Sequence, residues 1–476
     1  MKRTLTTILC AALLALTCCA TTQQQPAAPK PNIVIILSDD AGYADFSYNG
    51  CTQFATPNID RLARDGVVCS QGYVTASTCT PSRMGLMTGR YQQRFGAECN
   101  VPTIPTPGYT VEDLGLDTAE HTIAQAMRAN GYRTMAVGKW HLGELPQYHP
   151  NRRGFDEFYG FLGGSRSYWP LEDPNRGHQI LRNLQPVNEH EEIHYLTDDF
   201  TTAALDFIDR NRRQPFFLYL AYNAVHTPLQ AKEEDIEQYT EVTPENRRIL
   251  AAMTRSLDYN VGRLLAKLDA LELRENTLIF FVNDNGGPKG TTYSNRPLRG
   301  FKGTYWEGGI RVPFIASWPA RLPRGTHYDH PVSSLDLLPT AVAAAGGTID
   351  PARQLDGVNI LPYLTGERES PPHETLYWRF WRVSAVRRGP WKLIRVADDP
   401  LKQTRNLLLP LILLNLETDP AETTNVAKEN PAKTAELLKA LETWEQPLAK
   451  PRWYDGAKWK QWEAVSVDNH RINARQ

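Results

Sequence analysis

The sequence of 476 residues predicts an α/β fold, in which a mostly parallel central sheet flanked by helices precedes a smaller C-terminal subdomain. Three observations predict it. Continuous apolar runs of strand length occur in the first part of the chain, amphipathic helical patterns lie between them, and short strand candidates follow one another after about Gly366. Strands that alternate with helices are typical of a layered domain with a parallel sheet, whereas consecutive strands are typical of an antiparallel one.

The strands of the main sheet are predicted from four apolar segments. A strand that is buried on both faces has a continuous apolar run rather than an alternating pattern. The first run is Asn32–Leu37, and three others share its character: Tyr132–Val137, Pro215–Leu220 and Thr277–Val282. Of these, Tyr132–Val137 gives the weakest strand signal. These runs favour a parallel sheet that is covered by helices on both faces.

The helices between these strands are predicted from apolar residues that recur on one face. A short amphipathic segment, Thr122–Asn130, is ended by Gly131. A second helix has an apolar face made by Phe200, Ala203, Ala204, Phe207 and Ile208. A third, longer helix has the apolar stripe Leu250, Met253, Leu257, Val261, Leu264, Leu265 and Leu268.

The C-terminal subdomain is predicted as a small antiparallel sheet with one helix packed on it. Three short strand candidates, Leu376–Trp378, Ser384–Val386 and Trp391–Ile394, have no helix between them, and a helical stretch follows at Ala432–Trp444. We therefore place the catalytic domain at residues 32–366 and the α+β subdomain at residues 367–476.

The first nineteen residues have the layout of an export signal. Lys2 and Arg3 precede the apolar run Leu5–Leu16, which is too short to span a bilayer comfortably. The ending Leu16-Thr17-Cys18-Cys19 is similar to a bacterial lipoprotein cleavage box and favours lipidation of Cys19, with Cys18 and plain secretion as alternatives. Residues 20–31 are rich in Gln, Pro and Ala and predict a flexible tether. We expect an exported protein, either periplasmic or anchored at the outer membrane or cell surface.

Charge and cysteine content exclude several classes of function. The formal net charge is -1, so the chain lacks the basic field of a nucleic-acid-binding protein, and anion recognition must be local. Of seven cysteines, three lie in the signal, and the other four have no metal-finger spacing: Cys51, Cys69, Cys79 and Cys99. The sequence therefore predicts neither a disulfide scaffold nor a zinc finger.

Polar residues follow each of the four predicted strands. Ser38-Asp39-Asp40 follows the first, Lys139 and His141 follow the second, Asn223 and His226 the third, and Asp284-Asn285 the fourth. In open α/β sheets, ligands bind beyond the carboxyl ends of the strands, so these side chains are predicted to meet at one site. Asp39, Asp40, Asp284 and Asn285 are oxygen ligands, which favour calcium or magnesium over zinc. Taken singly, each pair is more typical of a strand-end turn than of a metal ligand, but the two pairs together at two strand ends favour a metal.

The most specific motif is the segment Cys79-Thr80-Pro81-Ser82-Arg83-Met84-Gly85-Leu86-Met87-Thr88-Gly89-Arg90. It resembles the signature of the formylglycine-dependent sulfatases, in which the cysteine of C-x-P-S-R is oxidised to formylglycine by a maturation enzyme. Further blocks that resemble this family extend the likeness from Asn32 to about Ala427: Gly138–Gly143, Asn223–Pro228, Leu298–Gly303, Glu307–Gly309 and Leu414–Pro420. The branch it resembles contains arylsulfatases and N-acetylgalactosamine-6-sulfatases, and it implies an alkaline-phosphatase-like fold.

The resemblance also implies a mechanism. Position 79 would carry hydrated formylglycine, one hydroxyl of which attacks sulfur beside a calcium ion, with magnesium less favoured. The cation would be held by Asp39, Asp40, position 79, Asp284 and Asn285. Four basic side chains would stabilise the diol and the sulfate or protonate the leaving alcohol: Arg83, Lys139, His226 and Lys302. His141 would take the proton of the second hydroxyl, so that sulfate leaves and the aldehyde returns.

The substrate is predicted to be a sulfated polysaccharide or its oligosaccharides. Arg166 and Trp169 in one segment, and Trp378 and Arg379 in another, are candidates to line the pocket, because aromatic rings pack on sugars and arginine recognises anions. Ordinary packing is the alternative for both tryptophans. Two other functions stay open: a phosphonate or phosphodiester hydrolase of the same superfamily, and a catalytically silent glycan-binding lipoprotein.

Overall fold

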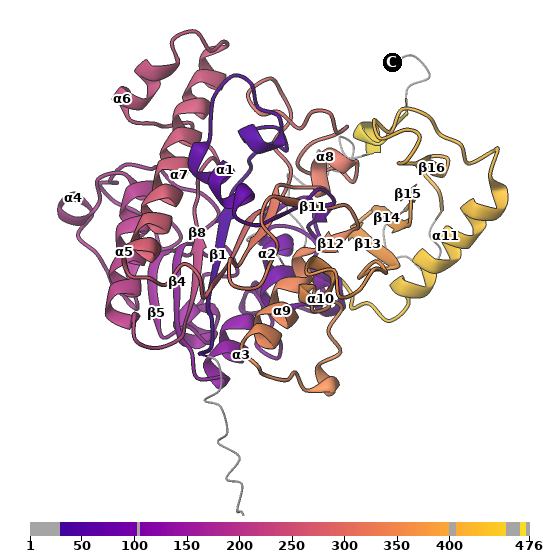
Figure 1. Ribbon diagram of the computed structural model, residues 1–476. Coiled ribbons are helices and arrows are strands. Elements are labelled where there is room, and N and C mark those ends of the chain that lie inside the picture. The colour runs from indigo at the N-terminus through magenta and orange to yellow at the C-terminus, as the bar shows by residue number, and fades with distance from the viewer. Residues whose placement is uncertain (1–28, 102–104, 399–405, 454–466, 473–476) are drawn as a thin grey trace, which may run out of the picture.

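A central sheet of ten strands carries the fold of the described residues, 29–101, 105–398, 406–453 and 467–472, in the computed structural model (Figure 1). Its parallel core consists of β9, β1, β8, β4 and β5, and β10 pairs with β9 in the antiparallel sense. This confirms the predicted mostly parallel sheet. In spatial order the strands are β11 (Thr326–Tyr328), β2 (Val67–Cys69), β10 (Phe314–Ser317), β9 (Thr277–Asn283), β1 (Asn32–Ser38), β8 (Phe216–Ala221), β4 (Arg133–Lys139), β5 (Glu157–Phe161), β6 (Leu181–Arg182) and β7 (Gln185–Pro186).

The core lies on both faces of this sheet, as the continuous apolar runs predict. Every residue of β1, β8 and β9 is buried. Alternate side chains of β1 point to opposite faces, so that Ile33 and Ile35 belong to one apolar cluster while Val34 and Ile36 belong to the other. Each face therefore needs its own layer of helices.

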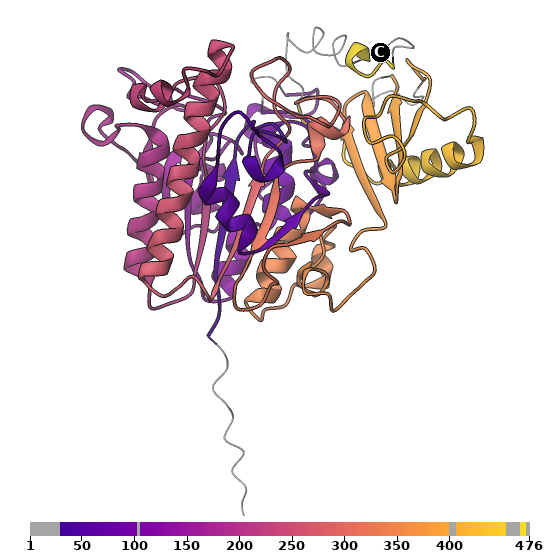
Figure 2. The same ribbon diagram turned by 45° about the horizontal axis from the view of Figure 1, so that its top comes forward.

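Helices cover both faces of the sheet (Figures 1 and 2). One cluster contains residues of α1 (Pro57–Arg64), α5 (Leu196–Asn211) and α7 (Glu245–Ala270). The opposite cluster contains residues of α2 (Cys79–Thr88), α3 (Ile123–Ala129) and α9 (Leu337–Ala344). The three predicted helices correspond to α3, α5 and α7. Thr122 caps α3, because its hydroxyl accepts a hydrogen bond from the Gln125 backbone N–H at 3.2 Å.

A separate antiparallel sheet of four strands forms the C-terminal part of the described chain (Figure 2, orange and yellow). It consists of β13 (Thr375–Phe380), β14 (Val383–Arg388), β15 (Trp391–Val396) and β16 (Ile412–Asn415) in sequence order. Helix α11 (Pro431–Glu445) packs on it through Leu437 and Leu441. The predicted sheet with one helix is confirmed, and β16 is a fourth strand that the sequence analysis had treated only as a family block.

Short elements complete the described chain. β3 (Gly72–Tyr73) and β12 (Val332–Ser333) form a two-stranded parallel ladder. Four short helices are α4 (Glu189–Glu192), α6 (Glu233–Ile236), α8 (Glu307–Ile310) and α10 (Leu361–Leu364). Single 3-10 turns lie at Ser47–Asn49, Gln92–Phe95, Val111–Asp113, Pro146–Tyr148, Pro150–Arg152, Glu237–Tyr239, Ser334–Asp336 and Pro351–Arg353.

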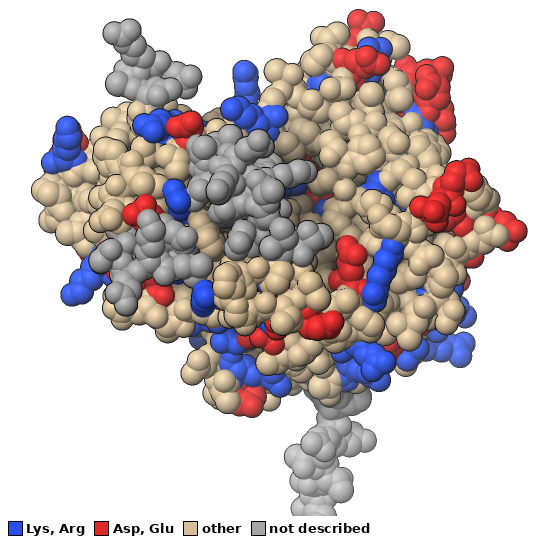
Figure 3. Space-filling model, turned by 180° about the vertical axis from the view of Figure 1, so that it is seen from behind, with Lys and Arg blue, Asp and Glu red and all other residues tan. Residues whose placement is uncertain are grey.

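The surface shows no gathering of one charge on the face seen in Figure 3, where basic and acidic side chains are interspersed. This agrees with the formal net charge of -1. Within the described part of the chain, no helix is long and apolar enough to cross a bilayer. The predicted signal, Cys19 and most of the predicted tether lie outside the described residues.

Candidate active site

Cys79 is the first residue of α2 and lies at the carboxyl edge of the central sheet. The preceding residue, Thr78, is extended, and Pro81 lies in the first turn, where its missing N–H costs nothing. Cys79 is only 1% exposed. Burial raises the pKa of its thiol to about 12, although Lys139 and Lys302 act in the opposite direction. The thiol is therefore protonated at neutral pH and is a weak nucleophile.

Two pairs of metal-ligand candidates lie beside each other because their strands are neighbours. β1 and β9 pair in register up to Ser38 and Asn283, so Asp39-Asp40 and Asp284-Asn285 leave the sheet together. The Asp40 backbone N–H donates to Asp284 Oδ1 at 3.2 Å, and the Asn285 amide donates to Asp40 Oδ1 at 2.7 Å. Cys79 Sγ lies 3.7 Å from Asp39 Oδ1.

Two buried basic side chains fix these carboxylates. Arg83 lies one turn beyond Cys79 on α2, and its Nη2 is 2.9 Å from Asp284 Oδ2 and 3.5 Å from Asp39 Oδ2. Arg83 Nη1 also donates to the Lys139 carbonyl at 3.0 Å. The Lys139 ammonium, at the end of β4, pairs with Asp39. Three strand ends and one helix are therefore joined around a single point.

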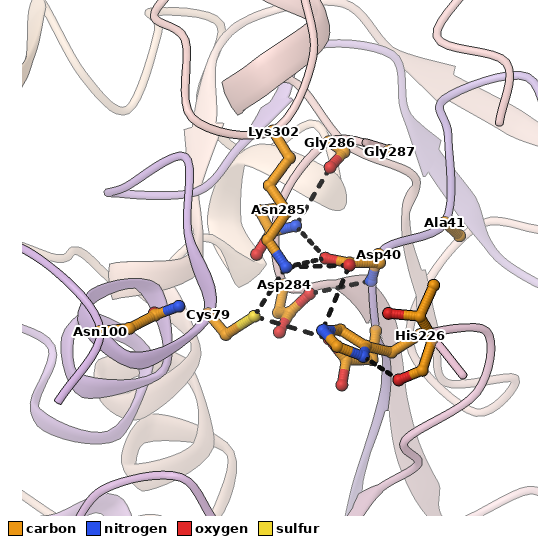
Figure 4. A network of polar contacts seen from close by, with 12 residues as sticks. Asp40, Ala41, Cys79, Asn100, His226, Asp284, Asn285, Gly286, Gly287 and Lys302 are labelled. Carbon is orange, nitrogen blue, oxygen red and sulfur yellow. Dashed lines mark hydrogen bonds and ion pairs between the residues drawn. The ribbon is translucent and has the colours of Figure 1, made fainter. Parts of the chain in front are cut away.

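Lys302 and His226 form the accessible side of this arrangement. Lys302 Nζ lies 3.3 Å from Cys79 Sγ and 2.7 Å from Asp40 Oδ1, while His226 Nε2 lies 3.4 Å from Asp40 Oδ2 (Figure 4). Their side chains are 19% and 16% exposed, whereas those of Arg83, Lys139 and Asp39 are fully buried. An incoming anion would meet Lys302 and His226 first.

His141 is a half-buried histidine whose Nδ1 atom is buried. Among the described residues its Nδ1 has no hydrogen-bond partner. Burial, aided by Lys139 and Arg83, holds the pKa of His141 well below its usual value, so the imidazole is neutral. A neutral imidazole with an unused nitrogen can accept a proton. Gly164 makes room for it, because a Cβ there would lie 2.5 Å from His141 Nε2.

The residues at the strand ends fit a hard divalent cation. Asp39, Asp40 and Asp284 are buried carboxylates, and the Oδ1 atom of Asn285 is buried without a hydrogen-bond partner among the described residues. Ligand atoms of Asp39, Asp40, Cys79 and His226 all lie within 4.8 Å of one another. Burial, and then the charge of Asp39, raise the pKa of Asp284 to about 6. A divalent cation would relieve this repulsion and use the free amide oxygen.

Three of the four candidate sugar-binding residues are structural, which corrects the prediction. Arg166 is buried and makes a bidentate ion pair with Glu189, at 2.9 and 2.8 Å. Arg379 is buried against Glu98, and its Nε donates to Glu98 Oε1 at 2.9 Å. Trp378 is 1% exposed, and its indole N–H donates to the Val74 carbonyl at 2.7 Å. These side chains have no surface to offer a sugar. Trp169 is half-buried and packs on Tyr195, with ring centroids 5.0 Å apart.

Two residues that shape the site, Asn100 and Gly164, were not predicted from the sequence. Asn100 lies beside Cys79 in Figure 4, and its Oδ1 accepts a hydrogen bond from the Thr80 backbone N–H at 2.9 Å. It therefore satisfies one of the free donors at the start of α2. Gly164 packs against His141. Neither role has a local sequence signal, because each depends on a contact between distant segments.

Comparisons with known proteins agree over most of the chain. The Sulfatase family model matches residues 31–347, and the model for the C-terminal region of N-sulphoglucosamine sulphohydrolase matches residues 301–447. Arylsulfatase J of Mus musculus is 32% identical over an alignment of 491 positions. The alignment covers 91% of this chain and 80% of the relative. N-acetylgalactosamine-6-sulfatase of Mus musculus is 34% identical over 381 residues, which cover 76% of this chain and 71% of the relative.

Solved structures show the same relationship. The crystal structure of Ps i-CgsB in complex with k-i-k-neocarrahexaose has a TM-score of 0.81 and 37% identity, and covers 92% of this chain and 98% of that one. The PsFucS1 sulfatase from Pseudoalteromonas sp. has a TM-score of 0.73 and 25% identity, with 88% and 90% covered. The predicted alkaline-phosphatase-like architecture is confirmed. On the family model, the curated relatives and these structures, the chain belongs to the sulfatase family and is a sulfuric ester hydrolase.

Proposed function

We propose that this sulfatase hydrolyses sulfate monoesters of a sulfated glycan. Cys79, converted to formylglycine, supplies the nucleophile, and a calcium ion is held by Asp39, Asp40, Asp284 and Asn285. One observation carries the proposal. Cys79 Sγ lies between carboxylate and ammonium, 3.7 Å from Asp39 Oδ1 and 3.3 Å from Lys302 Nζ. The atom at position 79 thus has the metal-ligand candidates on one side and a sulfate-binding cation on the other.

The formylglycine and the calcium ion each supply chemistry that the unmodified chain lacks. Hydrated formylglycine supplies a hydroxyl nucleophile and a second hydroxyl whose deprotonation restores the aldehyde. Calcium supplies positive charge that favours the ionised form of a hydroxyl at its side. The raised pKa of the Cys79 thiol, about 12 because of burial, supports a modified residue over a thiolate nucleophile. Calcium suits an oxygen-only cage better than magnesium, which retains several waters.

The remaining roles follow from position and charge. Arg83 and Lys139 are fully buried cations next to Asp39, and they hold the carboxylates in place and offset negative charge at position 79. Lys302 and His226 face the accessible side, where they bind sulfate oxygens and one of them protonates the leaving alcohol. His141 is neutral and accepts the proton that must leave position 79.

A sulfated carbohydrate is the substrate class that best fits the relatives. The 37% identical structure was solved with k-i-k-neocarrahexaose, a carbohydrate. The predicted export signal supports a substrate outside the cytoplasm, and we propose a periplasmic or surface location with an anchor at Cys19. A formylglycine-generating enzyme is the maturation partner that the Cys79 motif requires.

The proposal is tested at position 79 itself. Intact-peptide mass spectrometry of the active protein should show formylglycine in place of cysteine. Cys79→Ala should remove turnover of sulfate esters, by at least about 10³-fold, while circular dichroism stays unchanged. A thiol mass at Cys79 in fully active protein contradicts the nucleophile, and faster cleavage of nitrophenyl phosphate diesters than of sulfates favours the phosphodiester alternative.

Removal of the cation gives an independent test. Because three buried carboxylates meet at the site, chelation should lower both the melting temperature and the rate, and calcium should restore both better than magnesium does. Asp284→Asn should weaken this calcium-dependent stabilisation. Equal activity and equal melting temperature with and without chelator would contradict the proposed cation site.

A further inference from the structure

A large cavity lies next to the reaction centre and has no role in the chemistry described above. Its volume is about 900 Å³, which is within the usual range of ligand pockets. Two loops supply most of its wall, residues 49–53 after β1 and residues 288–301 after β9, and Arg247 of α7 closes one side. Both loops leave the carboxyl edge of the sheet, where the metal-ligand candidates lie.

The cavity shares its walls with the accessible side of the site. Gly300 and Phe301 line it and directly precede Lys302, whose backbone N–H donates to the Gly287 carbonyl at 3.0 Å. Figure 4 shows Gly287 beside Lys302. Tyr293 also lines the cavity, and its hydroxyl donates at 3.1 Å to the carbonyl of Val225, the residue before His226. The cavity is therefore bounded by the segments that carry Lys302 and position Val225 before His226.

The charge of the cavity wall has one sign. Its charged wall residues are Arg247, Lys289 and Arg296, and among the described residues that line it none is an aspartate or glutamate. By contrast, a second large cavity contains Asp329, Glu374 and Glu417 beside its basic residues. An anionic ligand would thus meet attraction without a competing carboxylate.

Two of these cations are available. Arg247 is already neutralised, because its Nη1 lies 2.5 Å from Asp45 Oδ1. Lys289 and Arg296 are exposed, and neither forms an ion pair or hydrogen bond with another residue that the structure describes. The Lys289 ammonium lies 5.3 Å from the centre of the ring of Phe301, the residue before Lys302. Asn49, Thr52 and Gln53 add neutral hydrogen-bonding groups to the same wall.

We propose that this cavity is an anion subsite, in which Lys289 and Arg296 bind a sulfate or carboxylate group on a sugar next to the one that is desulfated. The inference rests on the proposed function, because it assumes a sulfated glycan as substrate. It narrows that function to glycans with charged groups on adjacent sugars. Since both cations are exposed, the contribution of this subsite should weaken as ionic strength rises.

Binding without turnover tests this subsite separately from catalysis. The Cys79→Ala variant would be titrated calorimetrically with k-i-k-neocarrahexaose, a chondroitin sulfate hexasaccharide and a heparin hexasaccharide, each beside its chemically desulfated form. We expect at least one sulfated hexasaccharide to bind, and its affinity to fall about tenfold when Lys289→Ala and Arg296→Ala are added. The dependence of affinity on salt should become shallower at the same time.

Arg213→Ala is the matched control, since it removes one exposed positive charge near the amino end of β8, the opposite edge of the sheet. It should leave the affinity unchanged, and Arg296→Lys should retain most of it. Unchanged affinity in the double variant, an equal loss in Arg213→Ala, or no binding of any sulfated hexasaccharide would overturn the subsite. Failure of the catalytic proposal would instead appear as cysteine at position 79 in active protein, with these binding results unaffected.

Discussion

At the scale of single residues, burial decides the protonation state of the site. Cys79 is buried and His141 is half-buried, and burial disfavours the charged form of each, so the thiol keeps its proton and the imidazole stays neutral. Lys302 differs, because the charge of Asp40 outweighs the effect of its burial and holds its pKa well above the usual value. The site thus combines a permanent cation, Lys302, with a neutral base, His141.

The neutral base depends on a glycine that makes room for it, which gives a prediction for residue 164. A Cβ at Gly164 would lie 2.5 Å from His141 Nε2, so Gly164→Ala must displace the imidazole. A shift of about 1 Å at a catalytic group can cost on the order of 10²-fold in rate. We expect kcat to fall by about that factor while the melting temperature changes little.

Ser165→Ala, in the same loop, is the control for this prediction and should have nearly unchanged kcat. Steady-state kinetics on nitrophenyl sulfate, or on the best oligosaccharide, would measure both variants. If Gly164→Ala had the kcat of the wild type, His141 would not require its present position for catalysis.

At the scale of elements, a histidine–aspartate pair joins the start of the C-terminal sheet to the main domain. His373 lies just before β13, and its Nε2 is 2.8 Å from Asp336 Oδ1. Asp336 also accepts hydrogen bonds from the backbone N–H groups of Ser333 and Val358, at 2.8 and 2.9 Å. The Asp336 carboxylate therefore fixes the turn before α9, the loop that contains Val358 and the start of β13.

This pair predicts a pH-dependent stability. Burial acts to lower the pKa of His373, but Asp336 outweighs burial and raises it above 6.5. A pKa that is raised in the folded state stabilises the fold below the unfolded pKa, and this stabilisation is lost as pH rises through the folded pKa. His373→Asn should therefore reduce the free energy of unfolding by about 1–3 kcal/mol at pH 6 and by less at pH 9.

Chemical denaturation at the two pH values measures this difference. His194→Asn is a suitable control, since His194 is exposed and lies 3.6 Å from Asp199 in an open setting. Equal losses at pH 6 and pH 9 in His373→Asn would show that the imidazole is neutral in the folded protein.

At the scale of the whole molecule, a buried ionic cluster connects the catalytic loop with the C-terminal sheet. Lys392 of β15 lies 2.9 Å from Glu307 of α8 and 2.8 Å from Glu422, and all three side chains are at most 1% exposed. The Glu307 backbone N–H also donates to Glu422 Oε2 at 2.6 Å. Because α8 begins five residues after Lys302, this cluster ties the segment that carries Lys302 to the second sheet.

Removal of the lysine alone should be costly. Burial raises the pKa of Glu422 to about 7, and Lys392 and Arg387 overcome burial to lower that of Glu307 to about 2, so the cluster depends on its shared lysine. Lys392→Met leaves two buried carboxylates without their cation and should cost about 3–5 kcal/mol of unfolding free energy. Adding Glu307→Gln and Glu422→Gln should restore part of that loss.

Denaturant titration of these variants would be compared with Arg324→Ala, which breaks an exposed pair at 2.9 Å and should cost about 0–1 kcal/mol. Activity should fall together with stability in Lys392→Met, because α8 follows Lys302 closely. A loss no larger than that of Arg324→Ala would mean that the cluster does not hold the two parts together.

Much of the site could be predicted because it lies where strands end. The apolar runs fixed β1, β4, β8 and β9, and the carboxyl ends of parallel neighbours must share one edge, so the meeting of their polar residues followed from topology. The Cys79 motif and its family resemblance then added the helix that approaches this edge. Arg83 needed no further information, because it lies one helical turn from Cys79.

The roles of the residues that were wrongly predicted depend on their burial rather than on their residue type. Trp378, Arg379 and Arg166 have the chemistry that recognises sugars and anions. Each, however, is buried and forms a hydrogen bond or ion pair with another residue of this chain. Sequence reports what a side chain can bind, whereas the fold decides whether water or a ligand can reach it. The same holds for Asn100 and Gly164, whose roles arise from contacts across distant segments.

By itself, the sequence determined the layered α/β architecture, the antiparallel second sheet, the sulfatase family and the set of polar residues at the strand ends. Only the tertiary structure decided that Lys302 and His226 form the accessible side, that three candidate pocket residues are structural, and that a basic cavity adjoins the site. The physical reason is that periodicity and motifs are local along the chain. Exposure, cavity shape and the sum of charges are set by segments that meet only when the chain folds.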